Sequence, residues 1–407
     1  MSRTFQRCGL ACGFAGLAAV LVGLSAHRPA LAETCLSPYV KRLDRPEKYL
    51  YVFCVATGKN DDSLTVIDID LDSPRYGEVI YQLDLGSSGN ETHHFGFTDD
   101  RTHIWGCSLF SSRLFLIDVA TNPARPRLEK VIDGKQAGLA GPHSPYALPD
   151  RMLISFLSAQ DGGLPAGLAE FTNDGKFIRR LDLPRDAPYM YDVAVKPGLN
   201  RMVTSAFTPL NNYKKPLARM DLKDFGKELL VWDFRKRKVL AKLTTGLAPL
   251  ECRWSLKDKA DHGFTNCALA DSVWLWEGDG DGSYRARKLF ATGKLPADLR
   301  QSPDDRFLYV SCFVSNEIQQ WDVSDLKKPR LTSTLAPGVQ PNMMHVTGDG
   351  KRMYITNSLL STLDHAGTFW VRLAHIGPDG MKMDPFFNIN LNKLPKGPAR
   401  GHDMLLN

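Results

Sequence analysis

Residues 304–325 read DDRFLYVSCFVSNEIQQWDVSD. A polar turn leads through one basic residue, Arg306, into a run rich in aromatic and β-branched residues. A second apolar run follows and closes on acidic residues. Runs of this composition between polar turns are typical of β-strands. This stretch decides the fold because the same two-strand unit recurs along the chain.

Seven apolar runs each close on an acidic or polar residue, and these residues mark the repeat. The markers are 50, 52, 63, 44, 45 and 53 residues apart: Asp68, Asp118, Glu170, Asp233, Glu277, Asp322 and His375. Seven units at roughly 50-residue spacing predict an all-β fold, a seven-bladed β-propeller with four-stranded antiparallel blades. A generic series of hairpins is the alternative, and it does not explain the regular spacing.

The longest gap between markers contains a polar insertion, residues 208–228, which reads TPLNNYKKPLARMDLKDFGKE. Its second half is compatible with a short helix. We expect a plain surface loop, because long loops are only sometimes functional. A cover for one mouth of the central channel is the alternative.

Residues 1–32 are predicted to be a cleaved signal peptide. Basic residues precede the apolar run LACGFAGLAAVLVGL, and Ala30-Leu31-Ala32 gives the small-residue pattern of a cleavage site. We therefore expect a periplasmic protein whose residues 33–407 form one propeller domain, without stable membrane insertion after cleavage. An uncleaved anchor is the competing interpretation. Cleavage lowers the net charge from +6 to +3, which argues against nucleic acid as a partner.

The repeat places particular residues beside the channel. The anchor residues Arg101, Arg151, Arg306 and Arg352 follow polar turns, which we place between the first and second strands of a blade. Eight residues earlier, on the innermost strands, lie His93, His143, Asp298 and Met344. If the two chain ends pair in one blade, His402 joins the same channel.

His93, His94, His143 and His402 are therefore candidates for one metal site. Imidazole suits copper, zinc, iron and nickel, and copper binds most tightly in the usual order of affinities. Neighbouring residues on a regular strand point to opposite faces, so His93 and His94 both face the channel only if the strand bulges or ends there. For any single histidine, a structural role is the simpler interpretation.

Counting along the repeat in the same way places three acids near the channel: Asp192, Glu251 and Asp298. Such carboxylates orient ligand histidines or move protons, although structural hydrogen bonding is the simpler role for each. His345 is a weaker ligand candidate. The remaining mature-chain histidines are expected to be structural or exposed: His103, His262, His365 and His375.

Six cysteines follow the predicted cleavage site, and an exported protein permits disulfides of undetermined pairing. Cys54, Cys107 and Cys312 each lie six residues after the anchor of their blade, at Lys48, Arg101 and Arg306. A shared blade position indicates a small buried residue required by the fold.

Several long motifs in order resemble the selenium-binding protein family over nearly the whole mature chain. They include HHFGF, PHSPYALPDRMLIS, APLECR, DGKRMYITNSLLSTLD and GPARGHDM. Within this family, the chain resembles the exported bacterial methanethiol oxidases. The resemblance implies a propeller and a copper-dependent oxidase that converts methanethiol, oxygen and water to formaldehyde, hydrogen sulfide and hydrogen peroxide. The family's histidine motifs match His93, His94, His143 and His402, and its selenium-binding thiol matches Cys54.

Glu251 or Asp298 is then expected to move protons, with Cys54 as a further candidate catalytic residue. The main rival is a non-catalytic periplasmic protein that binds copper or a selenium or sulfur species. A lactonase or quinoprotein would use calcium held by carboxylates and carbonyls, which a histidine-rich site disfavours. A structural interaction propeller is the simplest fallback, because a fold alone does not give function.

Overall fold

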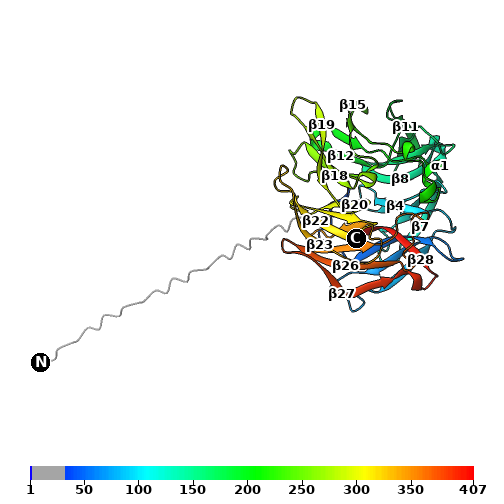
Figure 1. The fold of residues 1–407 in the computed structure, drawn as a ribbon. Coiled ribbons are helices and arrows are strands. Elements are labelled where there is room, and N and C mark those ends of the chain that lie inside the picture. Colours follow the sequence, from blue (N-terminus) through cyan, green and yellow to red (C-terminus); the bar gives the residue numbers. More distant parts are fainter. Residues whose placement is uncertain (2–32) are drawn as a thin grey trace.

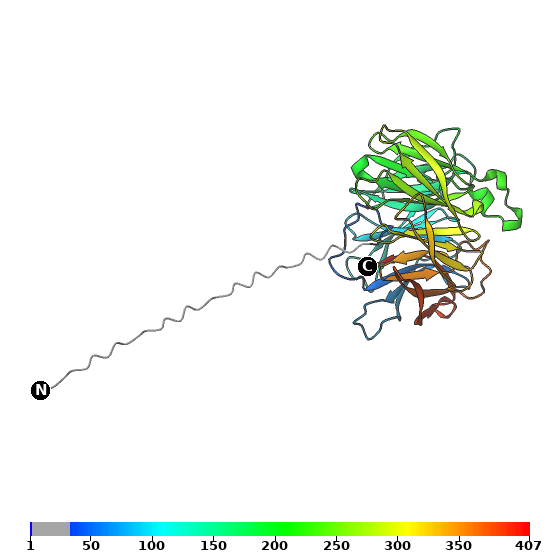
Figure 2. The ribbon, with the colours of Figure 1, turned by 60° about the vertical axis from the view of Figure 1, so that its left-hand side comes forward.

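The computed structural model describes Met1 and residues 33–407, so residues 2–32 of the predicted signal peptide lie outside it. Seven four-stranded antiparallel sheets surround a central axis, which confirms the predicted propeller (Figures 1 and 2). The seven marker residues all lie on the third strand of their blades, and each basic anchor lies just before the second strand or is its first residue. The period in the sequence therefore equals one blade.

Each blade is described from its innermost strand outward. The blade that joins the chain ends comprises β28 (Ala399–Leu406), β1 (Tyr49–Ala56), β2 (Ser63–Asp68) and β3 (Val79–Asp84). The next comprises β4 (Thr92–Phe97), β5 (His103–Ser108), β6 (Arg113–Asp118) and β7 (Arg127–Asp133). The third comprises β8 (Leu139–Leu148), β9 (Arg151–Ala159), β10 (Gly167–Thr172) and β11 (Phe177–Asp182). The fourth comprises β12 (Val193–Lys196), β13 (Arg201–Thr204), β14 (Glu228–Asp233) and β15 (Lys238–Thr244).

The remaining blades follow the same order. The fifth comprises β16 (Pro249–Trp254), β17 (His262–Cys267), β18 (Ser272–Gly278) and β19 (Tyr284–Ala291). The sixth comprises β20 (Pro296–Gln301), β21 (Phe307–Cys312), β22 (Glu317–Asp322) and β23 (Arg330–Leu335). The seventh comprises β24 (Met344–Val346), β25 (Arg352–Thr356), β26 (Trp370–Gly377) and β27 (Gly380–Asn390). Short 3-10 turns are η1 (Gly134–Ala137), η2 (Pro197–Leu199), η5 (Ala268–Ala270) and η6 (Leu391–Lys393).

The innermost strands contact one another in a closed ring, β28–β4–β8–β12–β16–β20–β24. β28 pairs with β1, so the C-terminal strand closes the ring as expected (Figure 1). Side chains distant in sequence consequently meet at one axis. This closure is what brings His402 to the blades of His93 and His143.

The core lies between neighbouring blades. Inner strands such as β1 and β5 are buried on both faces, so they read as continuous apolar runs, whereas the outermost strands are largely exposed. Phe53 of β1 contacts Phe95 of the next blade with ring centroids 5.1 Å apart. A Cβ atom at Gly106 would lie 2.5 Å from the Phe53 ring, so only glycine permits this approach.

Cys54, Cys107 and Cys312 are buried on second strands, as the shared spacing predicted. No disulfide forms among the six cysteines within residues 33–407. No helix of that part of the chain has both the length and the apolar character to cross a membrane.

The insertion corrects the expectation of a plain surface loop. It contains α1 (Leu210–Tyr213) in its first half, and η3 (Leu217–Arg219) and η4 (Leu222–Asp224) in its second. Tyr213 and Phe225 are buried against the channel, where they line the same cavity as His93 and His143. The insertion therefore covers one mouth of the channel. The sequence of the insertion is polar on average, but a few apolar side chains anchor it at the channel.

Candidate metal centre

A β-bulge lies at the level of His93, His143 and His402 in the innermost strands β4, β8 and β28. In β4, pairing runs from Thr92–Ser108 to Phe95–Gly106, so His93 and His94 together stand opposite one residue of β5. The pairing of β28 with β1 skips in the same way, at His402 and Asp403. Two residues opposite one break the strict alternation of faces. The bulge in β4 therefore allows the adjacent residues His93 and His94 both to face the channel.

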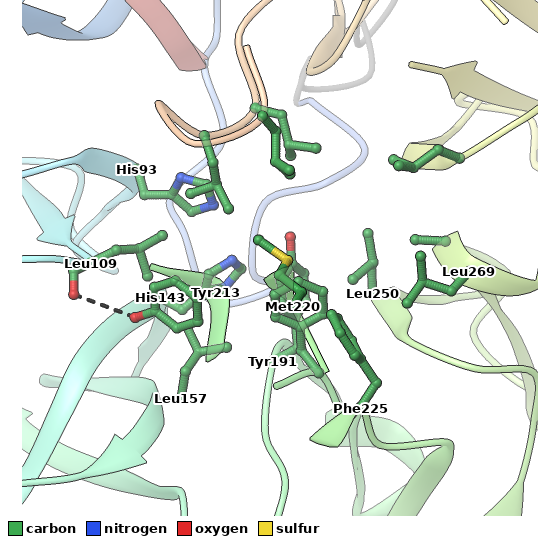
Figure 3. A pocket seen from close by; sticks show the side chains of 16 residues that line it. His93, Leu109, His143, Leu157, Tyr191, Tyr213, Met220, Phe225, Leu250 and Leu269 are labelled. Atoms are coloured by element: carbon green, nitrogen blue, oxygen red, sulfur yellow. Dashed lines mark hydrogen bonds between the residues drawn. The ribbon is translucent and has the colours of Figure 1, made fainter. Parts of the chain in front are cut away.

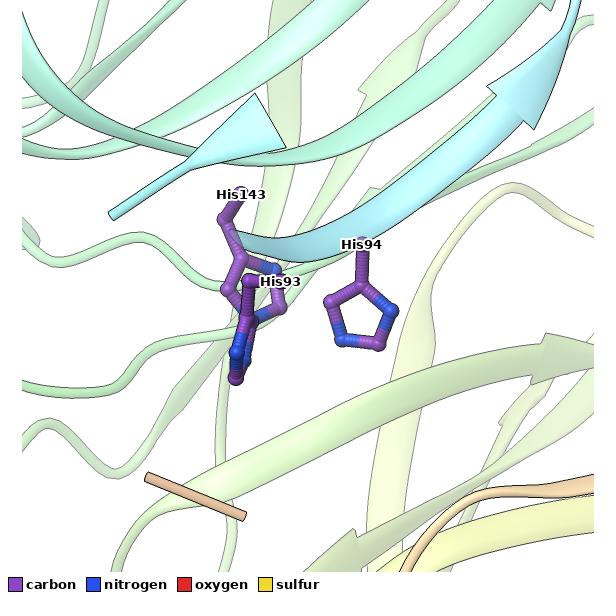
Figure 4. Close-up of side chains that lie close together, drawn as sticks. All are labelled: His93, His94 and His143. Atoms are coloured by element: carbon purple, nitrogen blue, oxygen red, sulfur yellow. The ribbon is translucent and has the colours of Figure 1, made fainter. Parts of the chain in front are cut away.

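The bulges bring the imidazoles of β4, β8 and β28 together, and His93, His94, His143 and His402 are here called the four-histidine cluster. Candidate ligand nitrogens of His93, His94 and His143 lie within 4.8 Å of one another (Figure 4). The His402 ring stacks on His93 with centroids 3.5 Å apart. All four side chains are buried. The register count from the sequence thus identified residues that do converge.

Hydrogen bonds fix the orientation of three of these rings. Nδ1 of His94 lies 3.0 Å from Asp403 Oδ2, and Nδ1 of His402 lies 2.9 Å from the Ser358 carbonyl oxygen. Carboxylates and carbonyls only accept, so Nδ1 donates in both and Nε2 keeps its lone pair. Nδ1 of His143 lies 2.9 Å from Ser144 Oγ. This pattern is how proteins orient metal-binding histidines.

The remaining ring nitrogens provide a test of whether a metal fits. Nε2 of His94, His143 and His402 and Nδ1 of His93 are buried without a hydrogen-bond partner among the described residues. An unpartnered buried polar atom costs free energy, and a metal ion coordinated by these nitrogens would remove that cost. The donor set fits copper or another imidazole-binding metal.

The electrostatics keep most of the cluster neutral. Burial, reinforced by the neighbouring histidines, lowers the pKa of His93 and His143 well below the usual value and lowers that of His402 to about 3. Burial also acts to lower the pKa of His94, but Asp403 and then Glu251 outweigh it and raise that pKa. Neutral imidazole is the form that binds metals.

One face of the cluster opens on a small apolar cavity of about 50 Å³ (Figure 3). His93 and His143 line it, and leucine and aromatic side chains supply most of the rest. The Tyr191 ring packs on His143 with centroids 3.9 Å apart. Tyr213 and Phe225 of the insertion close the cavity from outside. The space suits a molecule of a few heavy atoms.

The opposite face of the cluster is polar. The two predicted acids, Glu251 and Asp298, have different surroundings there. Glu251 Oε1 lies 3.8 Å from His94 Nε2 without a hydrogen-bond partner in the described chain, and burial raises the Glu251 pKa. Its other oxygen pairs with Arg253. Asp298 instead pairs with Arg300 at 2.9 Å and accepts a 2.7 Å hydrogen bond from the Met344 amide. Glu251 therefore lies beside the histidines, whereas Asp298 stabilises the neighbouring strand β24.

The other candidates lie elsewhere. Cys54 is buried in the core, with its thiol at the Val52 carbonyl and Thr65 hydroxyl, and burial raises its pKa to about 12. Its catalytic role stays a prediction. His345 lies on the polar side, with Nε2 2.9 Å from Asp403 Oδ1. The histidines expected to be structural or exposed lie outside both faces of the cluster and are half-buried or exposed: His103, His262, His365 and His375.

Sequence reasoning missed Asp403, whose two carboxylate oxygens contact His94 and His345. It also missed Arg253, which pairs with Glu251 and, at 3.0 Å, with Asp192. A signal for Asp403 was present. It follows His402 directly, as His94 follows His93, and a bulge in each of the two strands explains the two doublets.

The fold and the site together define the class of protein: a seven-bladed propeller with a buried cluster of partly unpartnered imidazoles at its axis. Within that class, this chain belongs to the family described as 56kDa selenium binding protein (SBP56), whose sequence model matches residues 34–407.

Individual relatives agree with this assignment. The chain is 35% identical over 422 residues to a methanethiol oxidase of Hyphomicrobium sp, covering 98% of this chain and 93% of the relative. It is 32% identical to a methanethiol oxidase of Ruegeria pomeroyi, covering 96% and 97% of the two chains. The crystal structure of a hypothetical selenium-binding protein from Sulfolobus tokodaii matches with a TM-score of 0.82 at 26% identity, covering 89% and 94%.

Proposed function

We propose that this protein is a copper-dependent methanethiol oxidase of the periplasm. It converts methanethiol, oxygen and water to formaldehyde, hydrogen sulfide and hydrogen peroxide. The observation that carries the proposal is the set of unpartnered imidazole nitrogens beside an apolar cavity of about 50 Å³. The names of the relatives in Hyphomicrobium and Ruegeria support the same activity. The periplasmic location rests on the sequence of residues 1–32, and cell fractionation tests it.

The four-histidine cluster would hold the copper ion. Copper bound there supplies one-electron redox chemistry and stabilises the thiolate form of a thiol. His94 and His402 present their Nε2 lone pairs because Asp403 and the Ser358 carbonyl hold their Nδ1 protons. The neutral form of each ring is therefore held in the tautomer whose Nε2 is free to bind a metal.

The apolar cavity positions the substrate. Its leucine and aromatic lining favours the methyl group of methanethiol and excludes most water. Tyr213 and Phe225 restrict the space, so bulkier thiols fit poorly. A dry site also strengthens the electrostatic interactions within it.

Glu251 holds and moves protons on the other face. Burial raises its pKa, so its carboxyl group is available to carry a proton. Its unpartnered Oε1 faces His94 Nε2 at 3.8 Å. Oxidation of the methyl carbon releases protons, and a carboxyl group with a raised pKa can take one up.

The test is sulfide release from methanethiol under air by the copper-loaded protein, with formaldehyde and peroxide measured in parallel. His143→Ala should abolish both copper binding and sulfide release. His375→Ala is the matched control, because His375 is exposed and pairs with Asp384 at 2.9 Å far from the cluster. Full activity in His143→Ala would refute the site. Copper binding without turnover in the unmodified protein would instead favour a copper or sulfur-species carrier.

A further inference from the structure

The polar side of the channel contains a second group of metal-ligand side chains, outside the four-histidine cluster. Glu33 Oε2 lies 3.1 Å from His345 Nδ1, and Cys35 Sγ lies 3.6 Å from the same carboxylate oxygen. Cys35 Sγ is also 3.8 Å from His345 Nδ1. One carboxylate, one thiol and one imidazole therefore face a single point.

The spacing of these three atoms matches a coordination shell. A tetrahedral ion with bonds of about 2.0–2.3 Å holds its ligand atoms roughly 3.3–3.8 Å apart. The observed triangle has sides of 3.1, 3.6 and 3.8 Å. An ion would therefore enter with only small side-chain movements.

Hydrogen bonds to other parts of the chain hold His345 and Glu33 in place. Nε2 of His345 lies 2.9 Å from Asp403 Oδ1, the arrangement that orients metal-binding histidines. The Leu406 amide donates to the second oxygen of Glu33, which ties the N-terminal segment to the last strand. Arg300 Nη2 lies 3.4 Å from His345 Nε2, on the side of the ring away from Glu33, and Arg300 Nε pairs with Asp298 at 2.9 Å. Neither Glu33 nor the cysteine thiol is paired with an arginine or lysine in the described chain.

We propose that Glu33, Cys35 and His345 bind a thiophilic d10 metal ion, Zn²⁺ or Cu⁺, at a second site. Thiolate, imidazole and carboxylate are all zinc ligands, and thiolate also selects Cu⁺. Glu33 and His345 are buried, whereas Cys35 is half-buried and lines a neighbouring cavity. Three protein ligands with one open side are typical of sites that exchange or activate a fourth ligand.

The second site is coupled to the first through one side chain. Asp403 directs Oδ2 to His94 and Oδ1 to His345. A single carboxylate thus orients one ligand of each site. The second site does not depend on the proposed oxidase activity, and metal content can be measured without methanethiol.

The test is zinc stoichiometry and X-ray absorption on the metal-free full protein, with Zn²⁺ as the probe. The unmodified protein should bind two equivalents and show a zinc–sulfur distance of about 2.3 Å. Cys35→Ser should lose one equivalent and the sulfur scattering. His143→Ala should lose one equivalent and keep the sulfur scattering, which separates the two sites. Cys107→Ala, a buried core control, should change neither result.

A second, conservative variant shows whether a loss of metal binding is caused by misfolding. Glu33→Gln keeps the size of the side chain and should weaken binding at the second site alone. A parallel titration with Cu⁺ under reducing conditions identifies which ion gives the tighter sulfur-ligated complex. Absence of metal–sulfur scattering with both ions, or its survival in Cys35→Ser, would overturn the proposal. Glu33, Cys35 and His345 would then be a hydrogen-bonded cluster only.

Discussion

Replacement of Asp403 by asparagine should weaken copper binding without unfolding the protein. Asp403 is buried, and its oxygens lie 3.0 Å from His94 Nδ1 and 2.9 Å from His345 Nε2. Asparagine keeps the shape and can still accept one hydrogen bond, but it removes the negative charge that strengthens both. A hydrogen bond to a charged group contributes about 1.5–3 kcal/mol. Loss of such a partner typically lowers metal affinity by about 10–100-fold.

The assay is a competition titration of the copper-loaded protein against a chelator of known affinity. Asp403→Asn should show a dissociation constant about 10–100-fold higher, equivalent to about 1.4–2.8 kcal/mol. Asp384→Asn is the control, because Asp384 makes the same kind of contact with His375 at the surface. Circular dichroism checks the fold. Unchanged copper affinity in a folded Asp403→Asn variant would refute the orienting role of this carboxylate.

Three further predictions concern catalysis, the cavity and pH. Glu251→Gln should keep copper binding and lower methanethiol turnover by about 10²-fold or more, as measured by sulfide release, because it removes the proton carrier; unchanged turnover would exclude that role. Phe225→Ala should cost about 3–5 kcal/mol in urea unfolding and raise turnover of propanethiol relative to methanethiol, since Phe225 lines the cavity; an unaltered preference would place the size limit elsewhere. The pKa of His402 is lowered to about 3, so its contribution to stability is complete above pH 6.5 and is lost at about 1.4 kcal/mol per pH unit as the pH falls toward 3. His402→Gln should flatten the pH dependence of the metal-free protein's unfolding free energy by that slope between pH 6 and 4, and an unchanged slope would contradict the burial argument.

The spacing of the repeat was enough to define the propeller and the position of its innermost strands. Strand length and turn length are local properties, so they recur at a fixed period along the chain. Counting from Arg101 and Arg151 consequently placed His93 and His143 at the axis. The convergence of His402 required one further assumption, the pairing of the chain ends, which β28 and β1 satisfy.

Other features depended on the closed ring. Cys35 and His345 are 310 residues apart, and only ring closure and the N-terminal segment bring them together. The separation of Glu251 from Asp298 likewise follows from side-chain pairing across neighbouring blades. Such contacts leave no periodic signal, because each forms only once. The sequence by itself determined the period and the ligand types, whereas the tertiary structure decided which atoms share a site, since that depends on bulges and closure at the axis.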